Sequence, residues 1–208
     1  MNKCWKTIFY MIILMVVPVL CSASGFDSIK KTYAGINALE AKFHQKLFIE
    51  NIKKAREFDG EFFYKRGKGF LWRYTKPTIK YFLYDGHYMW QDEEDKTFVL
   101  KREKNKEKAE NAFFDLVEDI TKIDDLFTLK QESISGDMTV LDLVPKQKAS
   151  IDAAKIWIDK QDLIRKIETK EFTGNINTIE FSGVKVNQSI SDGKFIYKSD
   201  KKKEVVEQ

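Results

Sequence analysis

The stretch over residues 60–77, GEFFYKRGKGFLWRYTKP, constrains the fold more than any other part of the chain. In its first half, and again after two turn glycines, aromatic side chains occupy every second position, which is the period of a β-strand. The aromatic positions of one face are Phe62, Tyr64, Phe70, Trp72 and Tyr74, and Arg66 ends the first run. The pattern predicts a β-hairpin with one aromatic face, which either fills a core or lines a binding cavity.

Alternating runs on both sides extend this hairpin into an antiparallel meander over residues 40–101. Turn signals such as Asp85-Gly86 separate its strands, and similar signals continue to Asp192-Gly193, which is expected to turn into a last strand over residues 195–197. We expect about ten or eleven strands, and an antiparallel sheet of that size curls or splits rather than staying flat. The predicted fold class is therefore mainly β with helices (α+β), an unclosed antiparallel half-barrel.

Two helices are predicted beside the sheet. A short one begins near Asp27 and carries Ile29, Tyr33 and Ile36 on one apolar stripe. A longer one spans residues 104–123 and carries Phe113 and Leu116 on its apolar face. A helix that is apolar on one side must cover an apolar surface, so the longer helix is either the cap of an ordinary core or the lid of a ligand cavity.

Residues 1–23 have the pattern of a cleaved secretory signal: a basic start, an apolar run too short to span a bilayer, and small residues before the cleavage point. Cleavage after Ala23 would remove both Cys4 and Cys21, so we expect no thiol chemistry in the mature protein. The expected mature chain is one domain over residues 24–198, followed by a charged, flexible tail over residues 199–208.

Several functions are excluded by what the sequence lacks. Only His44 and His87 could join a histidine metal site, and no nucleophile motif is present, so we expect neither a metal, nor a cofactor, nor an enzyme. Cleavage would remove Lys3 and Lys6 and lower the net charge from +4 to +2, which is too balanced for a polyanion partner. Residues 66–71 resemble part of an RNA-binding motif, but Lys68 and Arg73 stand where that motif needs aromatics. We therefore expect no nucleic acid.

Short motifs keep a characteristic order and spacing over residues 26–197. They include Ala41-x-Phe43-x-Gln45, Lys65-Arg66, Phe70-x-Trp72, Pro77, Asp85-Gly86, Trp90 and Ile156-Trp157-Ile158-Asp159. Together they resemble the periplasmic lipoprotein carrier family LolA. The resemblance implies an unclosed β-barrel with a helical lid, and a periplasmic chaperone that takes lipoproteins from an inner-membrane ABC-type release complex to an outer-membrane receptor. Two departures stand out: Gly67 replaces a family proline, and the C-terminal segment after Phe195 is reduced.

An apolar cavity for acyl chains is the expected site, since each buried methylene contributes about 0.8 kcal/mol. The chain has 16 Phe, 8 Tyr and 4 Trp, more aromatic bulk than one small core requires. The candidate lining residues are Phe62, Tyr64, Phe70, Trp72, Tyr74, Phe82, Tyr84, Trp90, Phe113 and Leu116. Their assignment to the inner face follows strand parity, which a one-residue slip would invert. Phe70 stands where the family has an aromatic at the cavity mouth, so Phe70→Glu is expected to weaken capture and leave the fold intact.

Arg66 ends the aromatic face and is expected to point its guanidinium toward a dry interior, where it must find acceptors. We expect these to be carbonyls of the helix over residues 104–123, and the resemblance likewise implies that this arginine ties the lid to the barrel. The expected protein is a monomer. A function from another class stays open: a lipid- or lipoprotein-sensing regulatory domain on a similar half-barrel.

Overall fold

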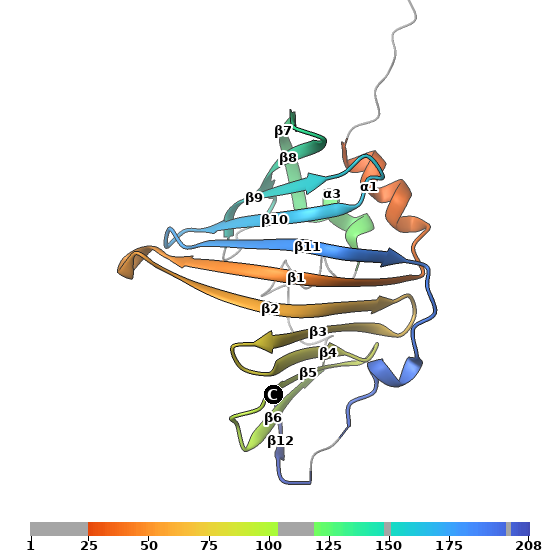
Figure 1. The fold of residues 1–208 in the computed structure, drawn as a ribbon, viewed down its shortest axis with the longest axis vertical. Helices are drawn as coiled ribbons and strands as arrows, with labels where there is room; N and C mark the ends of the chain where they lie inside the picture. The colour runs from red at the N-terminus through yellow and green to blue at the C-terminus, as the bar shows by residue number, and fades with distance from the viewer. Residues whose placement is uncertain (1–24, 104–118, 148–150, 199–200) are drawn as a thin grey trace, which may run out of the picture.

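The computed structural model describes residues 25–103, 119–147, 151–198 and 201–208 (Figure 1). Twelve strands form one sheet in the order β12-β6-β5-β4-β3-β2-β1-β11-β10-β9-β8-β7. The strands are β1 (Ala38–Ile49), β2 (Lys54–Lys65), β3 (Gly69–Lys76), β4 (Lys80–Tyr84), β5 (Tyr88–Glu93), β6 (Phe98–Glu103), β7 (Phe127–Ser135), β8 (Met138–Pro145), β9 (Ile151–Ile158), β10 (Ile164–Glu171), β11 (Ile176–Val186) and β12 (Glu204–Glu207).

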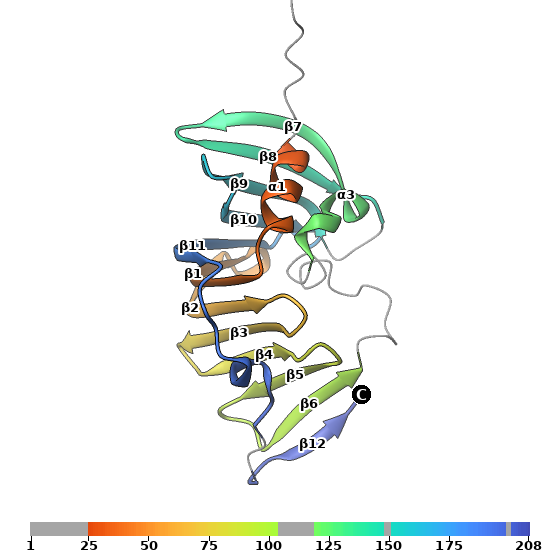
Figure 2. The same ribbon diagram turned by 90° about the vertical axis from the view of Figure 1, so that its right-hand side faces the viewer.

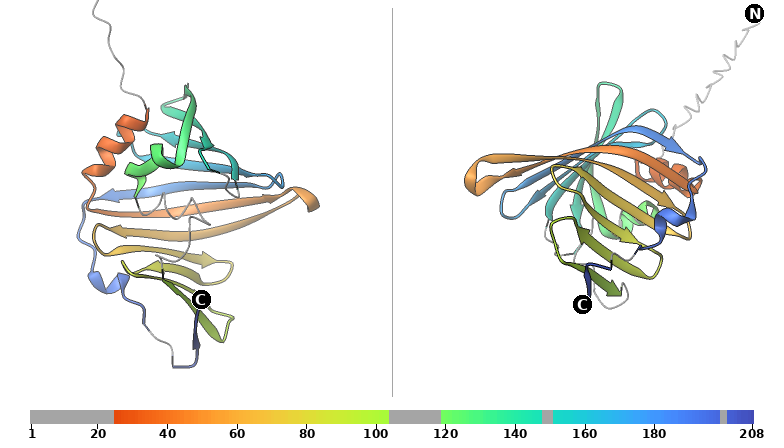
Figure 3. Two further views of the ribbon diagram at one scale, coloured as in Figure 1. Left: turned by 180° about the vertical axis from the view of Figure 1, so that it is seen from behind. Right: turned by 60° about the horizontal axis from the view of Figure 1, so that its bottom comes forward.

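The sheet is a meander whose neighbouring strands pair antiparallel, except that β12 pairs parallel to β6. β1 pairs with β11, which joins the first half of the chain to the second. The sheet curls strongly, and its end strands β7 and β12 stay apart (Figures 2 and 3). The predicted unclosed, mainly β architecture is confirmed.

Few helical segments are present in the described part of the chain. α1 (Gly25–Ala34), η3 (Ile120–Lys122) and α3 (Ile123–Leu126) lie on the concave side of the sheet (Figure 2). Ile29 and Ile123, both fully buried, pack there against strands β8 to β10. The remaining turns of helix are η1 (Glu50–Ile52), at the tip of the β1–β2 hairpin, and η4 (Asp192–Phe195), near the C-terminus.

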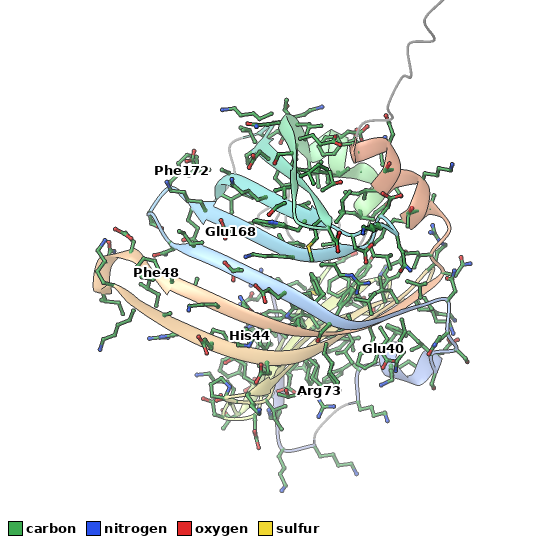
Figure 4. The ribbon with its side chains drawn as sticks, turned by 45° about the horizontal axis from the view of Figure 1, so that its top comes forward. Glu40, His44, Phe48, Arg73, Glu168 and Phe172 are labelled. Carbon is green, nitrogen blue, oxygen red and sulfur yellow. The ribbon has the colours of Figure 1, made fainter. Side chains whose placement is uncertain are left out.

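Both faces of the central strands carry apolar side chains, as their alternation requires. On the inner face, Phe62, Phe70 and Trp72 belong to one buried cluster. On the outer face, Phe63 and Leu83 are covered by Ile190 and Phe195 from the C-terminal segment. Elsewhere the outer face carries ion pairs together with apolar side chains such as Trp157. Glu40 pairs with Lys185 at 3.1 Å and His44 with Asp59 at 2.9 Å; Glu40, His44 and Arg73 are marked in Figure 4.

The C-terminal region differs from the sequence prediction in two places. The expected strand at residues 195–197 is absent; Phe195 instead ends η4 and is buried against the outer face. The tail that was expected to be flexible contains β12, which occupies the edge of β6. Lys203 anchors it through an ion pair with Asp92 at 2.5 Å, and the two side chains are only 13% and 12% exposed. Tertiary contacts thus order a segment that its charged sequence alone would leave solvated.

The longer predicted helix lies mostly outside the described residues, which resume at residue 119. Within its predicted span, residues 120–123 form η3 and the beginning of α3 rather than the end of one continuous helix. No helix in the described part of the chain is both long and apolar enough to cross a membrane.

Candidate ligand-binding cavity

A cavity of about 80 Å³ lies between the concave face of the sheet and the segments that cover it. Its floor comes from strands β1, β2, β3, β10 and β11, and its cover from the end of α1 and from η3. The lining residues are Tyr33, Ile36, Leu39, Ala41, Phe62, Tyr64, Arg66, Trp72, Asp119, Ile120, Thr121, Ile164, Ile167, Phe181 and Val184. The walls are mostly apolar, and the few polar groups gather around Arg66 and Asp119.

Three of the aromatic residues singled out in the sequence line this cavity: Phe62, Tyr64 and Trp72. Four others share the inner face without lining it. Phe70, Tyr74, Phe82 and Tyr84 pack in the same aromatic cluster as Trp72. Phe113 and Leu116 lie outside the described residues.

Phe70 is 1% exposed, with its ring 6.5 Å from that of Phe62 and 5.8 Å from that of Tyr84. It is therefore packed within the aromatic cluster, and its burial leads us to expect that Phe70→Glu destabilises the fold. A carboxylate at this position would lose its hydration without gaining a partner. The inner-face aromatics are thus divided between a packed core and a cavity wall.

Trp90 lies on the opposite face from its predicted position. Its cross-strand partner is Leu83 on the outer face, and its ring stacks on Tyr197 at 4.2 Å. Its indole nitrogen donates to the Asp85 carboxylate at 2.7 Å. A buried indole N–H needs an acceptor, and Asp85 and Tyr197 supply both the acceptor and the packing surface on that side. Met89 takes the inner position instead.

Arg66 lines the cavity but is exposed overall, so its guanidinium does not point into a dry interior. Its Nη2 donates to the carbonyl oxygens of Tyr33 at 3.0 Å, Ala34 at 3.0 Å and Ile36 at 2.8 Å, and its Nε donates to Ile36 at 3.2 Å. These carbonyls belong to the end of α1, not to the helix that the sequence led us to expect. The reason is general: a helix leaves its last carbonyls unpaired, and a cation there also suits the helix dipole.

Asn187 completes the attachment of the α1 end, and no sequence pattern singled it out. Its Oδ1 accepts from the backbone N–H of Asn37 at 2.7 Å, and its Nδ2 donates to the Gly35 carbonyl at 3.1 Å. Its backbone has φ 57°, a left-handed conformation that asparagine tolerates better than most residues. An asparagine just after a strand was the one available signal, but its partners lie about 150 residues earlier.

Tyr33 was assigned to an apolar stripe, and its hydroxyl has a further role. Its Oη accepts from the backbone N–H of Ile164, at the start of β10, at 3.1 Å. Burial raises the pKa of Tyr33 to about 12, so the hydroxyl is neutral at all working pH values.

Among the described lining residues, Asp119 is the one carboxylate, and its position follows from a local role. Its Oδ1 accepts from the backbone N–H of Thr121 at 3.2 Å and from the Thr121 hydroxyl at 2.5 Å, which caps η3. Burial opposes ionisation of this carboxyl, but the Thr121 hydrogen bonds and Lys122 outweigh it and hold the pKa of Asp119 below its usual range. Within the described ranges, no cluster of histidine, cysteine or acidic residues could hold a metal ion.

Comparisons with known proteins point to one family. The family model described as outer membrane lipoprotein carrier protein LolA matches residues 34–198. An outer-membrane lipoprotein carrier protein of Methylobacillus flagellatus is 25% identical over 185 residues, covering 89% of this chain and 90% of that protein. One of Xanthomonas oryzae pv. oryzae is 26% identical over 166 residues, covering 78% of each. An uncharacterized conserved protein of Thermus thermophilus shares the fold with a TM-score of 0.59 at 12% identity, covering 88% of this chain and 97% of that one.

Proposed function

Because this chain belongs to the outer-membrane lipoprotein carrier family LolA, we propose that it carries lipoproteins by sheltering their acyl chains in the cavity under α1 and η3. In this proposal the protein works as a monomer in the periplasm. It takes lipoproteins from an inner-membrane ABC-type release complex and passes them to an outer-membrane receptor. It acts by binding and release and performs no chemistry.

The observation that carries the proposal is an apolar cavity on the one face of the sheet that is hidden from water. Acyl chains gain most from a concave apolar wall, and large aromatic rings such as Phe62 and Trp72 supply it. The outer face offers no comparable cavity among the described residues, because its central strands carry ion pairs or are already covered by the C-terminal segment.

The size of the cavity bears on how it could take an acyl chain. A volume of about 80 Å³ has room for on the order of six water-sized groups, at roughly 10–15 Å³ each. A long acyl chain is larger, so the cavity must widen before it can take one. In this proposal Arg66 acts as a lid latch, which holds the end of α1 in place until a ligand enters.

A displacement assay tests the proposal. Purified mature protein should bind an apolar fluorescent probe, and a synthetic lipopeptide with acyl chains on its N-terminal cysteine should displace it. Val184→Glu would put a carboxylate in the cavity wall and should weaken both ligands, whereas Ser182→Glu adds the same charge on the exposed outer face of β11 and should not. A probe that stays bound against excess lipopeptide would contradict a shared apolar site. Capture without onward transfer to acceptor membranes would favour the sensing role.

A further inference from the structure

The end of α1 crosses the mouth of the cavity between two strands that are not neighbours. In the sheet, β11 and β1 lie between β10 and β2, and all four contribute to the cavity floor. Figure 2 shows α1 running along the concave side and ending near β11 and β1. We call residues 33–36, which end α1 and lead into β1, the cavity strap. Its side chains Tyr33 and Ile36 line the cavity from above.

On the β2 side, the strap is held by Arg66, which donates hydrogen bonds to three carbonyl oxygens of the strap. On the β10 side, the described contact is the Tyr33 hydroxyl, which accepts from the Ile164 N–H at 3.1 Å. This contact lies where β10 pairs irregularly with β9, between Ile164 and Lys166. A local irregularity of this kind frees backbone groups from the ladder, and here one of them meets the strap.

We propose that Tyr33 is a positioning residue that anchors the cavity strap to β10, opposite the Arg66 anchor on β2. With both anchors in place, the strap is tied down on both sides of the cavity, and Asn187 holds its Gly35 carbonyl between them. Widening the cavity for a ligand then requires the strap to leave β10 as well as Arg66 and Asn187. The closure follows from the contacts alone, whereas its effect on ligand release rests on the proposed carrier function.

The substitution Tyr33→Phe isolates the anchor. The ring stays in the cavity wall, but the Ile164 N–H loses its acceptor in the closed state and can regain one from water in the open state. The closed state is therefore weakened relative to the open, ligand-bound state. One such bond changes the equilibrium by about three- to tenfold. Tyr33→Phe should thus release ligand about three- to tenfold more slowly than the wild type.

Tyr81→Phe is the matched control. Tyr81 also makes a part-buried hydroxyl hydrogen bond of 3.1 Å, to Asp92, but on the outer face of the sheet. Release of a synthetic triacylated lipopeptide to acceptor vesicles would be timed for both variants. Slower release by Tyr33→Phe with unchanged release by Tyr81→Phe supports the anchor. A role in fold stability alone would give equal or faster release in Tyr33→Phe, and that outcome overturns the proposal.

A second measurement needs no ligand. The Gly35 and Ile36 amides donate within the strap, to Thr32 and Tyr33, and exchange with solvent when the strap opens. Their hydrogen exchange should quicken about three- to tenfold in Tyr33→Phe and not in Tyr81→Phe. Unchanged exchange would overturn the anchor even if lipopeptide binds. If the wild type binds no lipopeptide but exchange quickens as expected, the proposed function fails and the anchor stands.

Discussion

Arg66 shows how one residue can connect two parts of a structure. Its guanidinium serves the carbonyl ends of a helix that precedes it by about 30 residues. Because Arg66 is exposed, water competes for the same donors, and its hydrogen bonds are weaker than those of a buried arginine. The residue is therefore suited to a contact that must break and re-form, rather than to one that holds the core.

Arg66→Leu should favour the open cavity. The strap would lose its attachment to β2, and ligand release should slow about tenfold, because that attachment exists only in the closed state. Lys65→Leu is the comparison, since Lys65 is also a cation but binds Asp192 at 2.6 Å and the Ile190 carbonyl on the outer face. Release rates of both variants decide the matter. Equal behaviour, or loss of capture by Arg66→Leu, would contradict the latch.

Phe70 gives the opposite case, a residue whose effect should appear in stability. Phe70→Ala would leave a void between Phe62 and Tyr84 and should lower the free energy of unfolding by about 3–5 kcal/mol. Urea unfolding followed by tryptophan fluorescence measures this change. Phe172→Ala, at a side chain that is 64% exposed, should change it by less than about 0.5 kcal/mol. Similar losses in the two variants would show that Phe70 is not packed as described.

Among the elements, the turn between β9 and β10 holds the backbone just before Ile164, the residue to which Tyr33 is attached. The Asp159 carboxylate accepts from the backbone N–H groups of Gln161 and Leu163 and from Arg165 Nε at 2.6 Å. These bonds fix the turn that leads directly into Ile164. Burial disfavours the Asp159 carboxylate, but the backbone hydrogen bonds and Arg165 outweigh it and hold its pKa below the usual range.

This lowered pKa predicts a loss of stability in acid. An aspartate with a pKa below its unfolded value of about 3.9 stabilises the fold above that value, and the stabilisation disappears as pH falls through the folded pKa. As the pH is lowered below about 5, where such carboxyls begin to titrate, the free energy of unfolding of Asp159→Asn should therefore fall less than that of the wild type. Asp137→Asn, in the exposed β7–β8 turn, should follow the wild type. Parallel curves for Asp159→Asn and the wild type would contradict this role.

At the scale of the whole molecule, the end strands of the curled sheet do not pair with each other, and α1 and η3 cover its cavity. A sheet that meets its own end strands would be rigid, whereas an unclosed sheet can widen when its cover moves. In the proposed mechanism, the small cavity and the tied strap belong to the closed form. Ligand binding should therefore be accompanied by movement of α1 relative to the sheet.

Spin labels can report this movement. Labels at Lys31→Cys on α1 and Lys68→Cys in the β2–β3 turn, both exposed positions, should move apart when lipopeptide is added. Labels at Lys42→Cys and Lys155→Cys, both on strands of the sheet, should change much less. An unchanged Lys31–Lys68 distance with saturating ligand would show that the cavity widens in another way, or not at all.

Local sequence determined most of the sheet. Strand parity and turn residues depend on near neighbours, so the alternation of Phe62 and Phe63 between two faces and the Asp85-Gly86 turn could be predicted from the residues themselves. The resemblance to the LolA family was also readable, because it depends on the order of motifs along the chain.

What only the tertiary structure decided are the contacts between segments far apart in sequence. The Trp90 ring stacks on Tyr197 from the C-terminal segment, and Arg66 binds α1 because that helix ends beside β2. Parity leaves two faces available to a strand, and a cation can serve any unpaired carbonyl within reach. The partner that the folded chain brings close determines which carbonyl the cation binds and which surface the side chain packs against. A local sequence pattern does not identify that partner.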